Sequence, residues 1–251
     1  MKKISIAIPT YNSSLYLQKC LKGFRSLQPI GEIVIADDGS TDEELYKINK
    51  IVEMENTISE VPITLFKNKY EVIEKCNFEI VYQIDSDNIP GNNIFNVVNK
   101  IVNNFNSKYI YYPSRLYQFR KFHRVSLLNR NKQVRFTSRS IELGIEEVQQ
   151  SIKNNTNLFE DKHIGWVLNC GNFIVNRKNY LTSMKEGLLT DDLLSSDAVA
   201  ISYYWLKNGG KIFLDEDHYH FHRKRWDSVS FTEGKNSKIS AELFFNKIIE
   251  L

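Results

Sequence analysis

The amino-acid sequence predicts an α/β fold, a mostly parallel sheet flanked by helices, from two observations. The chain has 251 residues, of which 42% are hydrophobic and 25% charged, a composition typical of a globular protein with a large core. Along its first half, short β-branched runs alternate with longer segments that carry apolar residues at helical spacing. Strands joined by helices lie parallel, and open parallel sheets bind ligands outside the carboxyl ends of their strands.

This alternation predicts each element in turn, because a short apolar run favours a strand and helical spacing over a longer segment favours a helix. In the first half we expect strands at 4–8, 32–37, 63–66, 79–85 and 109–112, and helices at 15–27, after Thr41 and at 92–103. Beyond Pro113 the pattern is looser. It predicts helices near 141–153, 196–207 and 239–251, and strands near 172–175, 211–214 and 218–222. We find no repeat or linker, and therefore expect a single domain.

Charge and cysteine content exclude several classes of protein. A net charge of +3 lacks the concentrated basic footprint of a nucleic-acid-binding protein. Three cysteines without CxxC spacing argue against a disulfide framework or a zinc ribbon, and they fit a reducing compartment. The sequence has no readable signal peptide or membrane span. We expect a cytoplasmic protein, with contact at the inner face of a membrane as an alternative.

The acidic triplet Asp85, Ser86 and Asp87, which caps the apolar run 80–84, carries the clearest chemical signal. Two carboxylates in a turn offer hard oxygen ligands to Mg²⁺ or Mn²⁺ while leaving coordination positions for substrate phosphates. The triplet therefore indicates a metal site that handles phosphates.

Polar turns also follow the first two predicted strands. The first turn, 9–12, can present backbone groups and an aromatic face to a flat base. The second is Asp-Asp-Gly-Ser at 37–40, where a carboxylate can accept the imide N–H of uracil and Gly39 allows a positive φ. Alone, each is an ordinary turn or helix start. Together with the acidic triplet at a later parallel strand, they predict a nucleotide-base site beside a metal-diphosphate site.

With these motifs the sequence resembles the family 2 inverting glycosyltransferases, which have the GT-A fold. The resemblance rests on 6–12, 33–42, the acidic triplet and, more loosely, 196–198 with 206–209. It implies a nucleotide-sugar donor, with UDP expected, and Mn²⁺ or Mg²⁺ as cofactor. It also implies a single GT-A domain over 1–251, with a nucleotide-sugar-binding half at 1–113 and an acceptor and catalytic half at 114–251.

The resemblance implies roles for individual residues. Thr10, Tyr11 and Asp38 would hold the nucleoside. Asp85 would lie near the ribose and the metal, and Asp87 would be the direct metal ligand. The full set expected at the donor is Pro9, Thr10, Tyr11, Asp38, Lys75, Asp85, Ser86 and Arg223.

One departure from the family concerns the cation that faces the donor. The Arg-Asn pair common in the family is replaced by Lys75, Cys76 and Asn77. Lys75 and Lys69 are therefore the candidates for that cation.

Sugar transfer with inversion needs a carboxylate that deprotonates the acceptor hydroxyl. Asp197 is the expected base, because it precedes a strongly helical run whose positive end favours an ionised carboxylate. The family also places its catalytic Asp at the start of the helix that leads into a Lys-x-Gly turn such as 207–209. A first-turn acid without a catalytic role is the alternative, and the sequence does not separate Asp197 from Asp191 or Asp192.

His218, His220 and His222 alternate with aromatic residues, so in a strand their imidazoles share one side. A rise of about 3.3 Å per residue separates the first from the last by too much for one ion. The resemblance implies one histidine as a further metal ligand. His222 fits that place best and His220 second, with Arg223 available to the diphosphate. Three surface histidines on an edge strand are the alternative.

The predicted function is therefore sugar transfer from a nucleotide sugar to a hydroxyl of a glycan or other acceptor, without a nucleic-acid partner. The basic, aromatic segment 111–139 either is a solvated loop region or shapes the acceptor side, with cations for an anionic acceptor or a phospholipid headgroup. A non-catalytic binding module is the alternative function. A sugar nucleotidyltransferase would need a glycine-rich loop after the first strand, and 9–14 contain no glycine.

Overall fold

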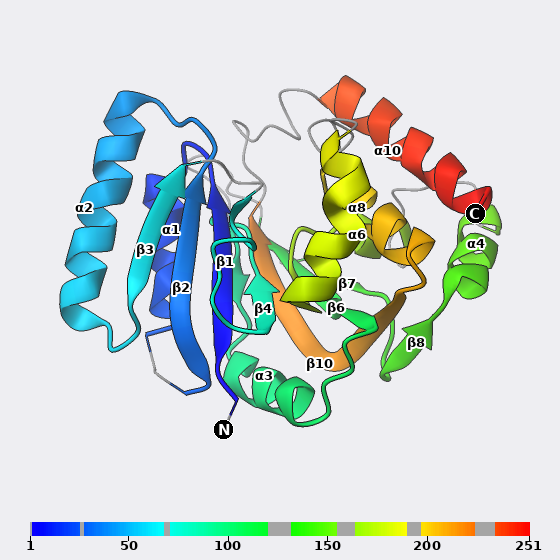
Figure 1. Cartoon of the computed structure of the whole chain (residues 1–251), viewed down its shortest axis with the longest axis horizontal. Helices are drawn as coiled ribbons and strands as arrows, with labels where there is room; N and C mark the ends of the chain where they lie inside the picture. Colours follow the sequence, from blue (N-terminus) through cyan, green and yellow to red (C-terminus); the bar gives the residue numbers. More distant parts are fainter. Residues whose placement is uncertain are drawn as a thin grey trace. The chain divides into compact units, whose positions relative to one another are not determined.

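The computed structural model describes residues 2–25, 28–67, 71–119, 132–154, 164–189, 197–223 and 234–251. These residues form two compact units (Figure 1). The first unit comprises Met1–Ser107 with Asn172–Lys178, and the second comprises Lys108–Gly171 with Asn179–Leu251. The expectation of a single domain stays a prediction.

The first unit contains a sheet that confirms the mostly parallel α/β fold. Its strand order is β3-β2-β1-β4-β9, in which β3, β2, β1 and β4 run parallel and β9 runs antiparallel to β4. The strands are β1 Ile4–Thr10, β2 Ile30–Asp37, β3 Ile63–Lys67, β4 Ile80–Gln83 and β9 Phe173–Asn176.

Helices of the first unit cover this sheet, which explains the uninterrupted apolar strands. They are α1 Ser14–Lys22, α2 Asp42–Ile58 and α3 Ile94–Asn103; a short strand, β5 Ile89–Pro90, precedes α3. Helix α1 packs on α2, and α2 lies along β3 (Figure 1). Strands buried on both faces read as continuous β-branched runs, and Ile6, Val34 and Val81 are accordingly inaccessible to solvent or nearly so.

The second unit is built on two long parallel strands, β6 Tyr109–Phe119 and β10 Lys211–Arg223. Strand β7 Lys132–Arg135 pairs antiparallel with β6, and β8 Ile141–Leu143 pairs antiparallel with β10. The helices are α4 Ile145–Lys153, α5 Ile164–Leu168, α8 Asp197–Lys207 and α10 Gly234–Ile249, together with most of α6 Arg177–Leu189. Helix α10 packs on α8 and α4 (Figure 1).

Several boundaries differ from the sequence prediction in this second unit. The expected strand end at Pro113 is wrong, because β6 continues to Phe119. Pro113 pairs in register with Asp215, where the pairing with β10 becomes irregular, and a bulge is a place where a strand tolerates proline. The two strands predicted at 211–214 and 218–222 are one strand interrupted by this bulge. The Ser114 hydroxyl holds the bulge by donating to the Glu216 carbonyl (3.2 Å).

Other elements were not predicted or begin elsewhere. The expected helix near 141–153 is a short strand, β8, followed by α4. The closing helix begins at Gly234 rather than near 239. Strand β7 and helices α5 and α6 have no counterpart in the prediction. The first two are short and give little periodic signal, and the 13 residues of α6 carry no clear apolar stripe. Among the described residues, no helix is both long enough and apolar enough to span a membrane.

Candidate donor and metal site

The acidic turn after β4 presents alternate residues to solvent. Asp85 and Asp87 are half-exposed, whereas the intervening Ser86 and the following Asn88 are buried, with exposures of 5% and 1%. The turn continues the ladder with β1 beyond the end of β4, since the Ile84 N–H donates to the Ala7 carbonyl at 2.9 Å. The geometry therefore leaves both carboxylates accessible to a ligand and uses their neighbours as anchors.

Two buried asparagines hold this turn in place. The Asp85 N–H donates to Asn172 Oδ1 at 2.9 Å. The Asn88 N–H donates to the Asp85 carbonyl at 3.0 Å, and Asn88 Nδ2 lies 3.4 Å from Asp85 Oδ2. Asn172 comes from the start of β9 and is 1% exposed. Asn172 thus fixes the backbone of the turn, and Asn88 orients the carboxylate of Asp85.

A chain of buried hydroxyls links the same turn to the end of β1. Thr10 Oγ1 and Ser13 Oγ lie 2.6 Å apart, and Ser13 Oγ and Ser86 Oγ also lie 2.6 Å apart. Thr10 is 2% exposed, so its hydroxyl, like that of Ser86, takes part in these hydrogen bonds and is not available at the surface. Both residues are expected at the donor; the structure places their hydroxyls beneath the surface, where they position the neighbouring backbone.

At the end of β2 the two adjacent aspartates have different environments. The buried Asp37 carboxylate accepts hydrogen bonds from the Gly39 N–H (3.1 Å), the Ser40 N–H (2.9 Å) and the Ser40 hydroxyl (2.5 Å). Gly39 has a φ of 83°, as its turn requires. Asp38 is half-exposed, and its N–H donates to the Thr10 carbonyl at 2.8 Å. Asp37 therefore shapes the turn, and Asp38 is the aspartate that solvent reaches.

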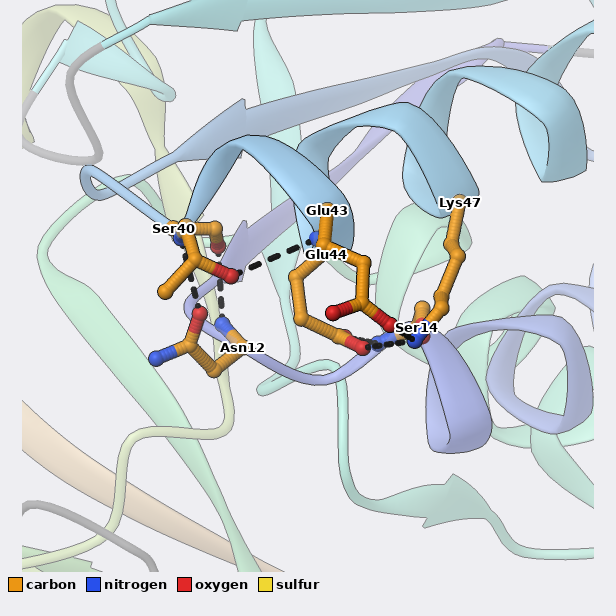
Figure 2. Close-up of polar contacts among 7 residues, drawn as sticks. Asn12, Ser14, Ser40, Glu43, Glu44 and Lys47 are labelled. Carbon is orange, nitrogen blue, oxygen red and sulfur yellow. Dashed lines mark hydrogen bonds and ion pairs between the residues drawn. The ribbon is translucent and has the colours of Figure 1, made fainter.

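Asn12 joins the loops that follow β1 and β2 (Figure 2). Its N–H donates to Ser40 Oγ at 2.8 Å, and its Oδ1 accepts from the Thr41 N–H at 3.0 Å. Asn12 has a φ of 45°, a conformation that asparagine adopts more readily than most residues. The preceding Tyr11 is 40% exposed. The loop after β1 is thus held by hydrogen bonds to the loop after β2, and the Tyr11 ring beside this junction remains accessible.

The candidate cation Lys75 has an acidic partner. Its Nζ lies 3.3 Å from Glu71 Oε2, and its side chain is 40% exposed. Lys75 is therefore engaged at the surface in this structure, and its role at the donor stays a prediction. Lys69 lies outside the described residues.

The histidines of β10 are not the surface histidines that the sequence allowed as an alternative. His218 and His220 are buried, His222 is half-exposed, and the rings of His220 and His222 have their centroids 6.1 Å apart. Burial lowers the pKa of His218 to about 4 and also lowers the pKa of His220. Both imidazoles are therefore neutral at pH 7, the form that binds metals.

His220 shows a further property of a ligand. Its Nδ1 is buried, and in the part of the chain that the structure describes it has no hydrogen-bond partner. A buried polar atom without a partner is costly unless something binds it. His220 thus fits a divalent cation at least as well as His222, which the sequence favours.

The remaining predicted residues are placed only by their backbone. Asp197 is the first residue of α8, and Arg223 is the last residue of β10, where it pairs in register with Phe119. The side chains of Asp197 and Arg223, and the whole of Asp191 and Asp192, lie outside the described residues.

The side chains that could ligate a metal fit a divalent ion that takes few protein ligands. Within the described ranges no three acidic, histidine or cysteine side chains cluster as a metal-binding group. Mg²⁺ in phosphate sites is held by one or two carboxylates, with phosphates and water completing the shell, and Asp85 and Asp87 are two accessible carboxylates on a fixed turn. The predicted site draws on residues of both units, and their convergence stays a prediction.

This arrangement of loops at parallel strand ends is that of an open α/β protein, in which ligands bind outside the carboxyl ends of the strands. The chain belongs to glycosyl transferase family 2, whose model matches residues 5–181. No curated protein matches it.

Solved structures share its GT-A fold. Residues 1–349 of S. aureus TarS, in complex with UDP-GlcNAc, are 17% identical with a TM-score of 0.59 over 98% of this chain. GalNAc-T7 with UDP, GalNAc and Mn²⁺ is 15% identical with a TM-score of 0.57 over 90%. Mannosyltransferase PcManGT from Pyrobaculum calidifontis with GDP-Man and Mn²⁺ is 12% identical with a TM-score of 0.54 over 97%. This chain covers 66%, 44% and 62% of those chains, respectively.

Proposed function

We propose that the protein is an inverting glycosyltransferase that moves a sugar from a UDP-sugar to an acceptor hydroxyl and depends on Mn²⁺ or Mg²⁺. The main observation behind the proposal is that hydrogen bonds join the loops after β1, β2 and β4. Asp38 N–H donates to the Thr10 carbonyl, and the Thr10–Ser13–Ser86 chain reaches the acidic turn. Accessible groups for a base and a diphosphate thus share one edge of the first unit.

The donor is proposed to bind through these accessible groups. The Tyr11 ring and the backbone of Pro9 and Thr10 would contact the base, and the Asp38 carboxylate would accept its imide N–H. Arg223 and Lys75 would face the diphosphate. Complexes of TarS with UDP-GlcNAc and of GalNAc-T7 with UDP support UDP, and PcManGT with GDP-Man makes GDP the comparison nucleotide.

Asp85 and Asp87 are proposed to hold the cation, with His220 or His222 as a further ligand. When bound, the divalent ion neutralises charge on the departing diphosphate. The Mn²⁺ complexes of GalNAc-T7 and PcManGT support the use of a divalent metal. The buried anchors Asn88 and Asn172 hold the acidic turn by hydrogen bonds to Asp85.

Asp197 is proposed as the general base. Its carboxylate takes the proton of the acceptor hydroxyl while the acceptor oxygen bonds to the anomeric carbon and the bond from that carbon to the diphosphate oxygen breaks. Attack from the side opposite the leaving group inverts the configuration. At the N-terminal end of α8, the helix dipole favours the ionised carboxylate. Asp191 and Asp192 are the rival bases.

The biological setting that we propose is glycan or polysaccharide synthesis in the cytoplasm by a single GT-A domain. Contact with the inner face of a membrane is compatible with this setting. No role in nucleic-acid binding is proposed, because the net charge is only +3.

The test separates donor binding from transfer. UDP and GDP are titrated calorimetrically with and without Mn²⁺, and hydrolysis of a panel of UDP-sugars is followed in parallel. We expect Mn²⁺-dependent UDP binding that Asp87→Asn weakens by about 100-fold, since the metal contributes several kcal/mol. Asp197→Asn should retain UDP binding and lose turnover. Asp42→Asn, a change at an exposed acid of α2, is the matched control.

Other outcomes would redirect the proposal. Donor binding without hydrolysis or transfer would indicate a non-catalytic binding module. Equal loss of UDP binding in the Asp87 and Asp197 variants would overturn their separate roles. Full activity of Asp197→Asn would move the base to Asp191 or Asp192.

A further inference from the structure

One face of the segment formed by β7, β6 and β10 gathers two arginines and three aromatic rings. Across the three strands, Arg135, Arg115 and Tyr219 share one register row, and Gln133, Tyr117 and Phe221 share another two residues along. Side chains two residues apart on a strand lie on the same face. We call the surface that these side chains form the arginine–aromatic face; it consists of Arg115, Tyr117, Arg135, Tyr219 and Phe221.

The three aromatic rings of this face contact one another. The centroid of the Tyr117 ring lies 5.4 Å from that of Tyr219 and 5.4 Å from that of Phe221, and the last two lie 5.6 Å apart. All three side chains are half-buried. The planes of the Tyr117 and Phe221 rings are tilted by 34°, whereas the Tyr219 ring meets each of them edge-on, at 76° and 84°. The more nearly parallel pair, Tyr117 and Phe221, suits the flat face of a sugar ring.

The described residues provide no anionic partner for the two guanidinium groups. Arg115 and Arg135 stand directly opposite each other on neighbouring strands, where like charges destabilise the pair. The Arg115 guanidinium carbon lies 5.1 Å from the centroid of the Tyr219 ring. The buried Arg115 Nε has no hydrogen-bond partner in the ranges that the structure describes. No carboxylate in the described part of the chain forms an ion pair with either arginine. The sequence also contains no Asp or Glu from Asn88 to Ile141.

This face is separate from the histidines of β10. His220 and His222 alternate with Tyr219 and Phe221, and therefore lie on the opposite side of the strand. His220 is buried, whereas Arg135 is exposed. A ligand on the arginine–aromatic face would not displace a metal ion from the histidine side.

We propose that the arginine–aromatic face is a second, non-catalytic binding site for an anionic glycan, a sugar chain that carries phosphate or carboxylate groups. An anionic group accepts hydrogen bonds from Arg115 and Arg135, whose planar forks match oxyanions, and an adjacent sugar packs on the rings. The inference rests on the proposed function in one respect, that the bound chain is the acceptor or product polymer. Its role is to hold that polymer while one end reacts.

The direct test is binding in the absence of donor. Phosphorylated dextran and unmodified dextran of the same length are titrated against the whole protein, with inorganic polyphosphate as a third probe. We expect phosphorylated dextran to bind more tightly than either reference. Arg115→Gln with Arg135→Gln should weaken that binding by roughly tenfold or more, because each removes a charge-assisted contact. Tyr117→Ala should weaken binding of phosphorylated dextran and leave binding of polyphosphate unchanged.

Controls keep the result interpretable. Arg139→Gln removes an exposed arginine between β7 and β8, outside the face, and should change binding by less than about twofold. Arg135→Gln alone, at an exposed position, covers the case in which the double variant does not fold. UDP binding in the presence of Mn²⁺ should be unchanged in Arg135→Gln and Arg139→Gln. Failure of the glycan-site proposal is therefore distinct from failure of the proposed function.

Three outcomes would overturn the proposal. Equal binding of polyphosphate and phosphorylated dextran, unaffected by Tyr117→Ala, would indicate an anion site that does not read sugar. Equal losses in Arg139→Gln and Arg135→Gln would indicate non-specific charge attraction. Arginine-dependent binding to vesicles containing phosphatidylglycerol, without binding to phosphorylated dextran, would identify a membrane surface instead.

Discussion

The loops at the strand ends of the first unit are held by hydrogen bonds within the protein, whereas the arginines of the arginine–aromatic face in the second unit find no anion among the described residues. In the loops, Asp37, Asn12, Ser13 and Asn172 all form hydrogen bonds within the protein. On the face, Arg115 and Arg135 meet no anion from the described part of the chain. Loops that are held by internal hydrogen bonds are preorganised for one ligand of fixed shape, whereas the arginine–aromatic face depends on a ligand to supply an anion.

The two units also differ in the burial of their ion pairs. In the first unit, Arg25 forms two hydrogen bonds of 2.8 and 2.7 Å with the fully buried Glu55 carboxylate on α2. In the second unit, Lys207 pairs with Glu186 at 2.6 Å, but the Glu186 side chain is 52% exposed. Similar distances therefore correspond to different contributions to stability, because only the first pair protects a charge that is out of water.

The largest expected effect comes from breaking the buried pair. Arg25→Met leaves the Glu55 carboxylate buried without its cation and should lower the free energy of unfolding by about 3–5 kcal/mol. Lys207→Met, the matched change in the second unit, should lower it by about 1 kcal/mol or less. Urea denaturation followed by circular dichroism measures both. Equal effects of the two changes would contradict the claim that only the Arg25–Glu55 pair protects a buried charge.

A smaller effect, but one closer to the site, is expected for Asn172→Ala. The change removes the acceptor of the Asp85 N–H and a neighbour of Asn88, so the acidic turn loses its anchor at a cost of about 1–3 kcal/mol. Mn²⁺-dependent UDP affinity should fall about tenfold or more. Calorimetry at several Mn²⁺ concentrations measures the change.

The control for that change is Asn49→Ala, which removes an exposed side chain of α2 that bonds only to its own helix among the described residues. It should leave UDP affinity within about twofold. Unchanged affinity in Asn172→Ala as well would show that the turn needs no anchor from β9.

The sequence alone predicts the parts of the first unit that have a local signal. Strands β1, β2 and β4 are recognisable because their apolar runs are buried on both faces, and the three motifs are recognisable because they directly follow those strands. The anchors of the motifs have no such signal. Ser13 meets Ser86 across 73 residues, and Asp85 meets Asn172 across 87 residues, so only the folded chain reveals their function.

The second unit was harder to predict for two physical reasons. Its strands are interrupted where a local rule predicts an end: Pro113 lies inside β6, and the acidic residues 215–217 lie inside β10 at a bulge. Its histidines look like edge-strand surface residues in the sequence, but β6 pairs with β10 along this stretch, and His218 and His220 are buried. Burial from neighbouring strands cannot be inferred from one strand's pattern.

The hydroxyl chain provides a third way to test how the loops are joined. Ser13→Ala removes the central hydroxyl, so Thr10 and Ser86 each lose a buried partner, and the free energy of unfolding should fall by about 1–3 kcal/mol. The control Ser151→Ala removes an exposed hydroxyl of α4 and should cost about 0.5 kcal/mol or less. If Ser13→Ala is as mild as its control, the loops after β1 and β4 are held together by their backbones alone.

The smallest effect concerns a buried thiol in the first unit. Burial, and after it the charge of Glu32, raises the pKa of Cys76 from 9.0 to about 12. A folded-state pKa above the unfolded one contributes stability that is complete below pH 9 and is lost as pH rises toward 12, because only the unfolded chain then releases the proton.

Between pH 7 and 8.5 the contribution of the Cys76 thiol to stability should be constant. From pH 9 to 10 stability should fall by about 1 kcal/mol more in the wild type than in Cys76→Ala, as measured by urea denaturation at each pH. Comparing slopes, rather than absolute stabilities, removes both the cavity that alanine creates and the tyrosines and lysines that titrate in the same range. Parallel slopes would mean that water reaches the thiol, and that this part of the first unit is less closed than its hydrogen bonds imply.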